Sequence, residues 1–225
     1  MVPARWPCPL PGGGTSEEFA LSRDAGRERR LLIVPALFDE ANKLRRFTVD
    51  VMRRLDATGI DSVLLDLPGC NESLQPLHVQ EPADWLDAAT AAAHHFGATH
   101  ALGIRGGCLF TPRHLPALHY APAKASAILR QMMRARILSS REAGREENRE
   151  TLSEAALEHG ITLAGYELGA DFYRHFESMV ANETATAIAQ EDVGGGGGLW
   201  LRAEPDESPD QADALSAILA RAIGR

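Results

Sequence analysis

Residues 30–66 read RLLIVPALFDEANKLRRFTVDVMRRLDATGIDSVLLD, and this stretch decides the fold class. Its apolar run at residues 31–34 is typical of a strand buried on both faces. Residues 44–55 then place apolar side chains at helical spacing, with arginines mostly on the outward side. A second apolar run follows at residues 61–66. A strand, a helix and a strand within about forty residues predict a parallel βαβ unit, so we expect an α/β protein.

The rest of the chain continues this alternation. Further strands are expected at residues 100–104, 115–120, 161–166 and 199–202. Further helices are expected at residues 83–96, 124–139 and 151–159, from residue 170 onward and after Ser208. The prolines and glycines of residues 1–17 predict a flexible leader, and residues 18–225 are expected to form a single domain. The expected architecture is a three-layer sandwich around a mostly parallel central sheet.

The composition excludes several classes of protein. Of the 225 residues, 44% are hydrophobic and 24% are charged, which is the balance of a folded globular protein. The 23 Lys and Arg against 31 Asp and Glu give a net charge of -8, which argues against a nucleic-acid partner. Three widely spaced cysteines form no CxxC pair, so we expect no disulfide framework, no metal site and no cofactor. No segment has the pattern of a signal peptide or a membrane span, and a cytoplasmic location is expected.

The loops at the carboxyl ends of the expected strands are the places to look for a site, because open parallel sheets bind ligands there. The third such loop reads Gly103-Ile104-Arg105-Gly106-Gly107. This sharp Gly-rich turn resembles the G-x-S-x-G nucleophile elbow of the α/β-hydrolases, with Arg105 at the position of the serine. Prolines at positions 112 and 116 leave room for only about two helical turns after it. We therefore expect an α/β-hydrolase-like fold with a reduced helix after the elbow.

Several elements together resemble one family more closely. They are Glu40-x-Asn42-Lys43-x-Arg45-Arg46, Asp66-Leu67-x-Gly69, Gly103-Ile104-Arg105-x-Gly107, the segment from Leu129-Arg130 to Arg134-x-Arg136, and Gly165-Tyr166-Glu167-Leu168. Between residues 31 and 171 the chain is similar to the exosortase A system-associated hydrolases of type 2, which are found beside exopolysaccharide gene clusters. An arginine at the elbow belongs to the pattern of that family. Its members are named hydrolases by their fold, so the resemblance implies a class more than a reaction.

Two functions are open at this point. The resemblance implies an ester or acyl hydrolase linked to exosortase and exopolysaccharide biosynthesis, with an anionic small-molecule or saccharide-linked ligand. The residues favour a pseudoenzyme, a non-catalytic α/β-hydrolase fold that acts as an anion- or sugar-binding or regulatory module. The reason is that the loop at residues 203–212 has no histidine to complete a Ser-His-Asp triad. The sequence leaves open whether the chain is an enzyme and what its oligomeric state is.

Arg105 is the first candidate site residue. A guanidinium at the start of a helix meets the positive end of the helix dipole and therefore needs an anion nearby. The internal candidates for this anion are Glu40 and Glu72, and the external candidate is a bound phosphate, carboxylate or acidic sugar. An internal pair is the main expectation, and a ligand contact is the alternative.

Three further residues are candidates for a catalytic role. Cys70 and Cys108 could replace the missing serine as nucleophiles, although a lone cysteine is more often buried and inert. Asp66 is expected mainly to fasten the Gly69 turn by accepting backbone N–H bonds. The expected substrate-binding residues are Glu40, Asn42, Lys43, Gly103, Gly106 and Gly107. Asn42 and Lys43 either position an anion or simply cap the helix that they open.

Overall fold

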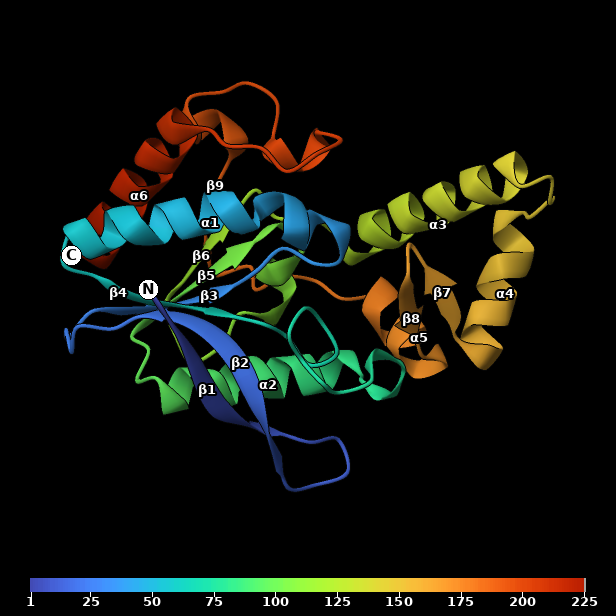
Figure 1. Ribbon diagram of the computed structural model, residues 1–225, viewed down its shortest axis with the longest axis horizontal. Helices are drawn as coiled ribbons and strands as arrows, with labels where there is room; N and C mark the ends of the chain where they lie inside the picture. Colours follow the sequence, from blue (N-terminus) through green and yellow to red (C-terminus); the bar gives the residue numbers. More distant parts are fainter. Residues whose placement is uncertain (225) are drawn as a thin grey trace.

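A seven-stranded sheet forms the centre of the computed structural model, which describes residues 1–224. The strands are β1 (Val2–Pro9), β2 (Thr15–Arg23), β3 (Arg30–Val34), β4 (Asp61–Leu65), β5 (His100–Ile104), β6 (Ala117–Tyr120) and β9 (Thr186–Ile188). Their order in the sheet is β1-β2-β4-β3-β5-β6-β9 (Figure 1). The strands from β4 onward in this order are parallel neighbours, whereas β1 and β2 pair antiparallel. The predicted βαβ unit is thus confirmed as the middle of a mostly parallel sheet.

Helices cover both faces of this sheet. α1 (Asp39–Ala57) and α6 (Pro209–Ile223) pack together on one face, and α2 (Pro82–His95) lies on the other (Figure 1). The apolar stripe of α1 is buried against the sheet, as its helical spacing predicts. Two apolar clusters of buried side chains fill the molecule. The expected three-layer α/β sandwich is therefore confirmed.

The first two strands show that the prediction of a flexible leader is wrong. Every residue from Val2 to Pro9 pairs with a residue of β2, and Gly13 and Gly14 make the turn between them with positive φ. The prolines are tolerated because β1 is the edge strand, where a missing N–H breaks no inner ladder. Trp6 and Cys8 point inward and are fully buried at 0% exposure. This alternation of inward side chains was the signal for a strand.

The segment between β6 and β9 forms a lobe that we call the cap. It contains α3 (Ala125–Glu142), α4 (Arg149–His159), β7 (Ile161–Leu163), β8 (Tyr166–Leu168) and α5 (Ala170–Glu177). The cap projects beyond the end of the sheet at which α1 begins, which is the carboxyl end of the parallel strands (Figure 1). The strand expected at residues 161–166 is instead a small antiparallel hairpin outside the main sheet, because the chain reverses at Ala164 and Gly165 with φ of 50° and 85°.

The prediction of a last strand at residues 199–202 is also wrong. Those residues form the short 3-10 helix η4 (Leu199–Leu201), and the last strand of the sheet is β9. Two of its apolar side chains, Leu199 and Trp200, are buried. The apolar character of this segment therefore reflects burial of side chains and not pairing of the backbone. Two further 3-10 helices are η1 (Leu77–Val79) and η3 (Gln190–Val193).

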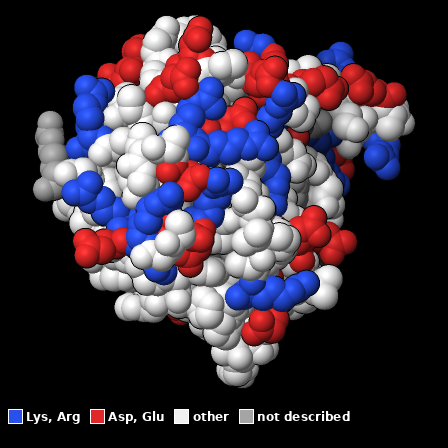
Figure 2. Space-filling model, turned by 60° about the vertical axis from the view of Figure 1, so that its left-hand side comes forward, with Lys and Arg blue, Asp and Glu red and all other residues white. Residues whose placement is uncertain are grey.

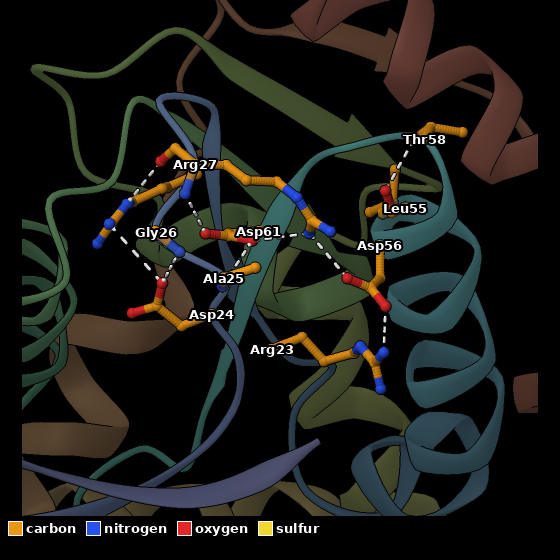
Figure 3. A network of polar contacts seen from close by, with 10 residues as sticks. Arg23, Asp24, Ala25, Gly26, Arg27, Leu55, Asp56, Thr58 and Asp61 are labelled. Atoms are coloured by element: carbon orange, nitrogen blue, oxygen red, sulfur yellow. Dashed lines mark hydrogen bonds and ion pairs between the residues drawn. The ribbon is translucent and has the colours of Figure 1, made fainter.

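Charged side chains fasten the amino end of the sheet to the end of α1 (Figure 3). The Asp61 carboxylate accepts hydrogen bonds from the backbone N–H groups of Ala25 and Arg27 at 3.1 and 2.8 Å. The Arg27 guanidinium bridges Asp61 and Asp56 at 2.8 and 2.7 Å, and Arg23 also pairs with Asp56. Figure 2 shows basic and acidic side chains interleaved over this side of the molecule. Because these groups satisfy one another, they form a structural network and not an open charged site.

Candidate functional site

The chain turns sharply after β5, at the place where the elbow pattern predicts a turn. Arg105 has a φ of 53°, in the left-handed region where a residue other than glycine is strained. The short 3-10 helix η2 (Arg105–Phe110) follows, so the expected reduced helix is confirmed. A β-carbon at Gly103 would lie 2.5 Å from the Cα of Cys108, and one at Gly107 would lie 2.2 Å from the carbonyl oxygen of Pro35. The backbone approaches too closely at both positions for any side chain.

The Arg105 side chain is held by partners from two other loops. Its Nε and Nη2 donate to the two carboxylate oxygens of Glu40 at 3.0 and 3.1 Å. Its Nη1 donates to the carbonyl oxygen of Ala121 at 2.9 Å. The Arg105 and Glu40 side chains are 17% and 11% exposed, so this bidentate pair is largely removed from water. Of the two carboxylates expected as partners, Glu40 takes the role, and Glu72 is exposed.

Glu40 owes its position to the first turn of α1. A carboxylate is favoured there by the helix dipole. Phe38, at the N-cap of the helix, has a φ of 56°, which turns the chain sharply between β3 and α1. The Arg105 guanidinium is a site for an anion beside this first turn. The chain fills that site with its own carboxylate.

Trp200 covers the same guanidinium from η4. The Cζ of Arg105 lies 4.1 Å from the Trp200 ring centroid, a cation–π contact. Tyr120, at the end of β6, packs edge-on against Trp200 with a centroid distance of 6.1 Å and donates its hydroxyl to Oε1 of Gln190 at 2.6 Å. Burial raises the pKa of Tyr120 to about 12, although the Arg105 charge acts in the opposite direction. At neutral pH this tyrosine is therefore a neutral hydrogen-bond donor and not a base.

Apolar side chains fill the space beside the elbow. A crevice between the loops that follow β3 and β4 has a free volume of about 10 Å³, roughly the room that one water molecule needs. It is lined by Pro35, Ala36, Leu37, Phe38, Ala41, Leu67, Cys70, Asn71 and Tyr166. Phe38 packs edge-on against Tyr166 of the cap, with ring centroids 5.1 Å apart, and also contacts the rings of Trp85, Phe172 and Phe176. A β-carbon at Gly106 would lie 2.7 Å from Leu37, so this packing continues up to the elbow.

The two cysteines near the elbow are a buried thiol, Cys108, and a half-buried one, Cys70. Cys108 is fully buried, and burial raises its pKa above the ordinary value in spite of the nearby Arg105 charge. Burial and the neighbouring Asp66 carboxylate raise the pKa of Cys70 to about 12. Only a thiolate is a good nucleophile. Both side chains are thus protonated and weakly nucleophilic at neutral pH.

Asp66 does not have the role expected for it at the Gly69 turn. The Gly69 N–H donates instead to the hydroxyl of Ser73 at 2.9 Å. Asp66 is 1% exposed, and its Oδ1 accepts hydrogen bonds from Arg45 at 2.8 Å and from Asn71 at 3.1 Å. Its buried Oδ2 has no hydrogen-bond partner among the described residues. Because the Ser73 hydroxyl accepts the hydrogen bond of the Gly69 N–H, the Asp66 carboxylate is not needed in the turn. It binds the Arg45 guanidinium and the Asn71 amide instead.

The remaining expected ligand contacts, the half-buried Lys43 and the exposed Asn42, lie in the first turns of α1. Lys43 pairs with Asp39 at 2.7 Å, which is a pair at helical spacing i,i+4. Asn42 is exposed, and its side chain makes no hydrogen bond with the described residues. Neither side chain caps the helix, whose N-cap residue is Phe38. Their proposed contact with an anionic ligand stays a prediction.

The sequence reasoning missed three residues around Arg105. Ala121 contributes only a carbonyl oxygen, which no side-chain pattern can indicate. Gln190 and Trp200 come from the end of the sheet that was assigned incorrectly. A tryptophan two positions after a run of five glycines was the one usable signal, because a flexible approach and a large ring favour a side chain that folds back onto the protein.

Residues 1–224 show neither a metal-binding cluster nor a membrane-spanning helix. This part of the chain contains no group of three or more His, Cys, Asp and Glu side chains arranged to hold a metal ion. Among the helices of the same residues, none combines the length and the apolar character that crossing a membrane requires.

Comparisons with known proteins identify the fold. No family model and no curated protein matches the sequence. The structure is similar to that of a protein from Agrobacterium vitis S4, named as a candidate hydrolase, with a TM-score of 0.55 and 13% identity over 99% of this chain and 98% of the other. It is also similar to Est1E from Butyrivibrio proteoclasticus, solved with ferulic acid bound, with a TM-score of 0.52 and 13% identity over 77% and 74% of the two chains.

A third similar structure is alpha/beta hydrolase domain-containing protein 10 from mouse. Its TM-score is 0.52 at 13% identity, over 79% of this chain and 70% of that one. Identities this low show the fold alone. The chain therefore has the α/β-hydrolase fold.

Proposed function

We propose that this protein is a non-catalytic module with an α/β-hydrolase fold, which binds an anionic saccharide-linked ligand or regulates a partner. One observation carries the proposal: the elbow position that presents a nucleophile in acyl-transfer enzymes holds Arg105, whose guanidinium is bound by Glu40, Ala121 and Trp200. A guanidinium stays protonated at all relevant pH values and cannot attack a carbonyl carbon. The chemistry of the elbow therefore favours binding.

The surroundings of the elbow support the same proposal. A serine- or cysteine-type acyl transfer needs a nucleophile, a base within hydrogen-bond reach and space for the acyl group. Cys70 and Cys108 have raised pKa values, and residues 203–212 contain no histidine. The crevice beside the elbow holds about one water molecule. The described surroundings of the elbow thus offer no activated nucleophile, no histidine base from residues 203–212 and no room for an acyl group.

The proposed ligand class follows from what Glu40 does. Its carboxylate occupies the anion site that the Arg105 guanidinium makes. A uronic acid carboxylate or a sugar phosphate has the charge to exchange with this carboxylate. In this proposal Glu40 is the internal competitor of the ligand.

The second candidate is an ester or acyl hydrolase linked to exosortase and exopolysaccharide biosynthesis. One observation favours it: the backbone of the elbow keeps the strained φ of 53° at Arg105 and the close glycine contacts on both sides. Strain of this kind is often retained for function. The family resemblance of the sequence motifs points the same way.

An ester panel separates the two candidates. Short-chain and long-chain p-nitrophenyl esters are assayed with the wild type and with Arg105→Ala, Cys70→Ala and Cys108→Ala. We expect no turnover above background for any of the four proteins. Turnover by the wild type that any one substitution abolishes would establish an enzyme and overturn the proposal.

Calorimetric titration tests the binding function directly. Glucuronic acid and glucose 6-phosphate are the probes, and uncharged glucose is the control ligand. We expect Glu40→Gln to bind the anionic sugars at least tenfold more tightly than the wild type, because the internal competitor is gone; tenfold corresponds to about 1.4 kcal/mol. The matched variant Glu72→Gln removes an exposed carboxylate and should bind like the wild type. Equal affinities of Glu40→Gln and the wild type for the anionic sugars would mean that these ligands do not bind at Arg105.

A further inference from the structure

The cap presents a basic helical face on the side of α3 that faces away from its packed side. α3 projects from the molecule at the cap end (Figure 1). Its buried residues are Ala125, Leu129, Met132, Met133 and Ser140. Arg130, Arg134 and Arg141 are exposed, and their spacings of four and seven positions place them together on the opposite face. We call these three arginines the basic stripe.

The arginines of the basic stripe form no ion pair with the described residues, although Arg141 lines a hollow that Glu146 and Glu147 also line. Arg136 of the same helix shows the contrast, because it forms a bidentate pair with Glu147 at 3.1 and 2.8 Å. Within residues 1–224 the three stripe arginines form no ion pair. Leu138 lies beside them and is 59% exposed. Unpaired arginines next to an exposed apolar side chain are typical of the centre of a protein interface.

A complementary surface lies in another part of the same chain. Residues 183–213, which we call the acidic segment, carry eight carboxylates against a single basic residue, Arg202. Three of the carboxylates are paired with arginines of the chain, through Asp206, Glu207 and Asp213. The other five, Glu183, Glu191, Asp192, Glu204 and Asp210, are exposed and form no ion pair within residues 1–224. Leu201 of the same segment is 74% exposed.

We propose that two copies of this chain associate through these surfaces, with the basic stripe of one copy against the acidic segment of the other. The basic stripe has three unpaired positive charges and the acidic segment has five unpaired negative ones, and each carries one exposed leucine, Leu138 or Leu201, so the two surfaces are complementary in charge and share an apolar side chain. No ion pair within residues 1–224 joins the two surfaces of one copy to each other. The contact is head-to-tail. A dimer therefore keeps one basic stripe and one acidic segment free, and further copies can add to these surfaces.

The net charge of -8 does not prevent this association at moderate ionic strength. At physiological salt the Debye length is about 8 Å, so distant charges of the two copies are screened while groups in contact are not. Screening also predicts how the association depends on the salt concentration. Raising the salt to about 1 M, where the Debye length falls to about 3 Å, should weaken a contact made by partly exposed charges.

Sedimentation velocity over a concentration series tests the proposal. We expect the wild type to form dimers and larger species at physiological salt and to dissociate toward monomers at about 1 M salt. Arg130→Glu/Arg134→Glu/Arg141→Glu should weaken the association by more than about tenfold, because three attractions become repulsions. The matched control Arg5→Glu/Arg53→Glu/Arg113→Glu makes the same change of net charge on other exposed arginines. It should weaken the self-association much less than reversal of the basic stripe does. Far-ultraviolet circular dichroism checks that all variants are folded.

A charge swap makes the test specific to the two surfaces. Glu191→Arg/Glu204→Arg/Asp210→Arg reverses the acidic segment, and we expect this variant to be monomeric by itself. Mixed in equal amounts with the stripe-reversed variant, it should form assemblies in which the two variants alternate, because each native surface meets the opposite native surface and each reversed surface meets the opposite reversed one. A wild type that stays monomeric throughout the series, or a mixture that shows no complex, would overturn the proposal. Stripe-dependent binding of polyglutamate by a monomeric wild type would assign the basic stripe to a different acidic partner and overturn it as well.

Discussion

Arg105 and Glu40 face each other as a bidentate pair, with N–O distances of 3.0 and 3.1 Å, although 65 positions separate them in the sequence. The arginine follows β5 directly, and the glutamate lies in the first turn of α1. The pair therefore joins two loops at the carboxyl edge of the sheet. The left-handed backbone of Arg105 has to be held in place by its surroundings, and this pair is one of the contacts that can do so.

A double-mutant cycle should measure a strong coupling between the two side chains. We expect Arg105→Ala and Glu40→Ala each to lower the free energy of unfolding by about 3 kcal/mol, because each leaves a largely buried charge without its partner. The double variant should lose less than the sum of the two, by at least about 1 kcal/mol. Urea denaturation at neutral pH gives all four values. The exposed pair of Arg46 and Glu207 is the control, and its coupling should be below about 1 kcal/mol. Additive losses at Arg105 and Glu40 would contradict the pair.

Small carboxylates should partly rescue the Glu40→Ala variant. The substitution leaves space beside a guanidinium that Ala121 and Trp200 still hold in place. Formate or acetate can enter this space and bind the guanidinium as the lost side chain did. We expect the melting temperature of Glu40→Ala to rise with formate concentration at constant ionic strength, and that of Glu72→Ala to stay unchanged. An equal response of both variants would indicate a general salt effect.

The sequence predicted the centre of the fold well because local patterns determine it. The apolar run at residues 31–34 and the helical stripe from Leu44 to Leu55 lie where the structure has β3 and α1. The Arg105 turn was also predictable, since glycines on both sides of a strand end indicate a close approach of the backbone. Because a guanidinium at this position requires an anion nearby, the sequence also indicated two candidate partners for Arg105, Glu40 and Glu72. Only the three-dimensional structure could select Glu40.

The errors occurred where local signals and tertiary contacts disagree. Prolines in residues 2–9 indicate a loop by themselves, but burial of Trp6 and Cys8 stabilises an edge strand in which a proline costs little. Residues 199–202 have the composition of a strand, but Trp200 binds the Arg105 guanidinium and the backbone pairs with no other strand. Both errors arise from contacts between residues that are far apart in the sequence. No window of neighbouring residues contains that information.

Gly107→Ala should destabilise the elbow far more than an alanine at an open glycine. The new β-carbon would lie 2.2 Å from the carbonyl oxygen of Pro35, so either β3 or η2 has to move. We expect a loss of about 3 kcal/mol in the free energy of unfolding, at the upper end of the cost of overpacking. Gly197→Ala is the matched control, because a β-carbon there meets no atom within 4 Å. It should be neutral or stabilising by about 0.5 kcal/mol. Equal stabilities of the two variants would show that the close approach at Gly107 is not real.

The cysteines should resist alkylation in the folded protein. Burial is the main cause that raises the pKa of Cys8 and Cys70 to about 12, so only about one thiol in ten thousand is ionised at pH 8. We expect iodoacetamide to modify the native protein at least a hundredfold more slowly than the protein in urea. Fast modification of Cys70 in the native state would instead support a nucleophilic cysteine.

The raised pKa values of Cys8 and Cys70 also predict that the protein loses stability in alkali. Since the folded pKa lies above the ordinary 9.0, the protonated thiols favour folding fully below pH 9, and this contribution disappears as the pH rises toward 12.

The cap should lose stability in acid through Glu147. Hydrogen bonds from Arg136 and Ser140 lower the pKa of this carboxyl from 4.5 to about 2, and Arg136 also donates to the carbonyl oxygen of Thr162 at 2.8 Å. Because the folded pKa is lowered, the ionised carboxylate favours folding above about pH 4.5, and its contribution is lost as the pH falls toward 2. Glu147→Gln should therefore be less stable than the wild type at pH 7 and approach it near pH 2.

The exposed neighbour Glu146 provides the control for this prediction, because it forms no ion pair within residues 1–224. Glu146→Gln should follow the stability of the wild type at every pH. Hydrogen exchange of α3 and β7 amides, followed by mass spectrometry at pH 3 to 7 with rates corrected for intrinsic exchange, locates the effect in the cap. A difference between Glu147→Gln and the wild type that does not change with pH would mean that Glu147 acts through packing and not through its charge. The ion pair would then not be what joins the end of α3 to the β7–β8 hairpin.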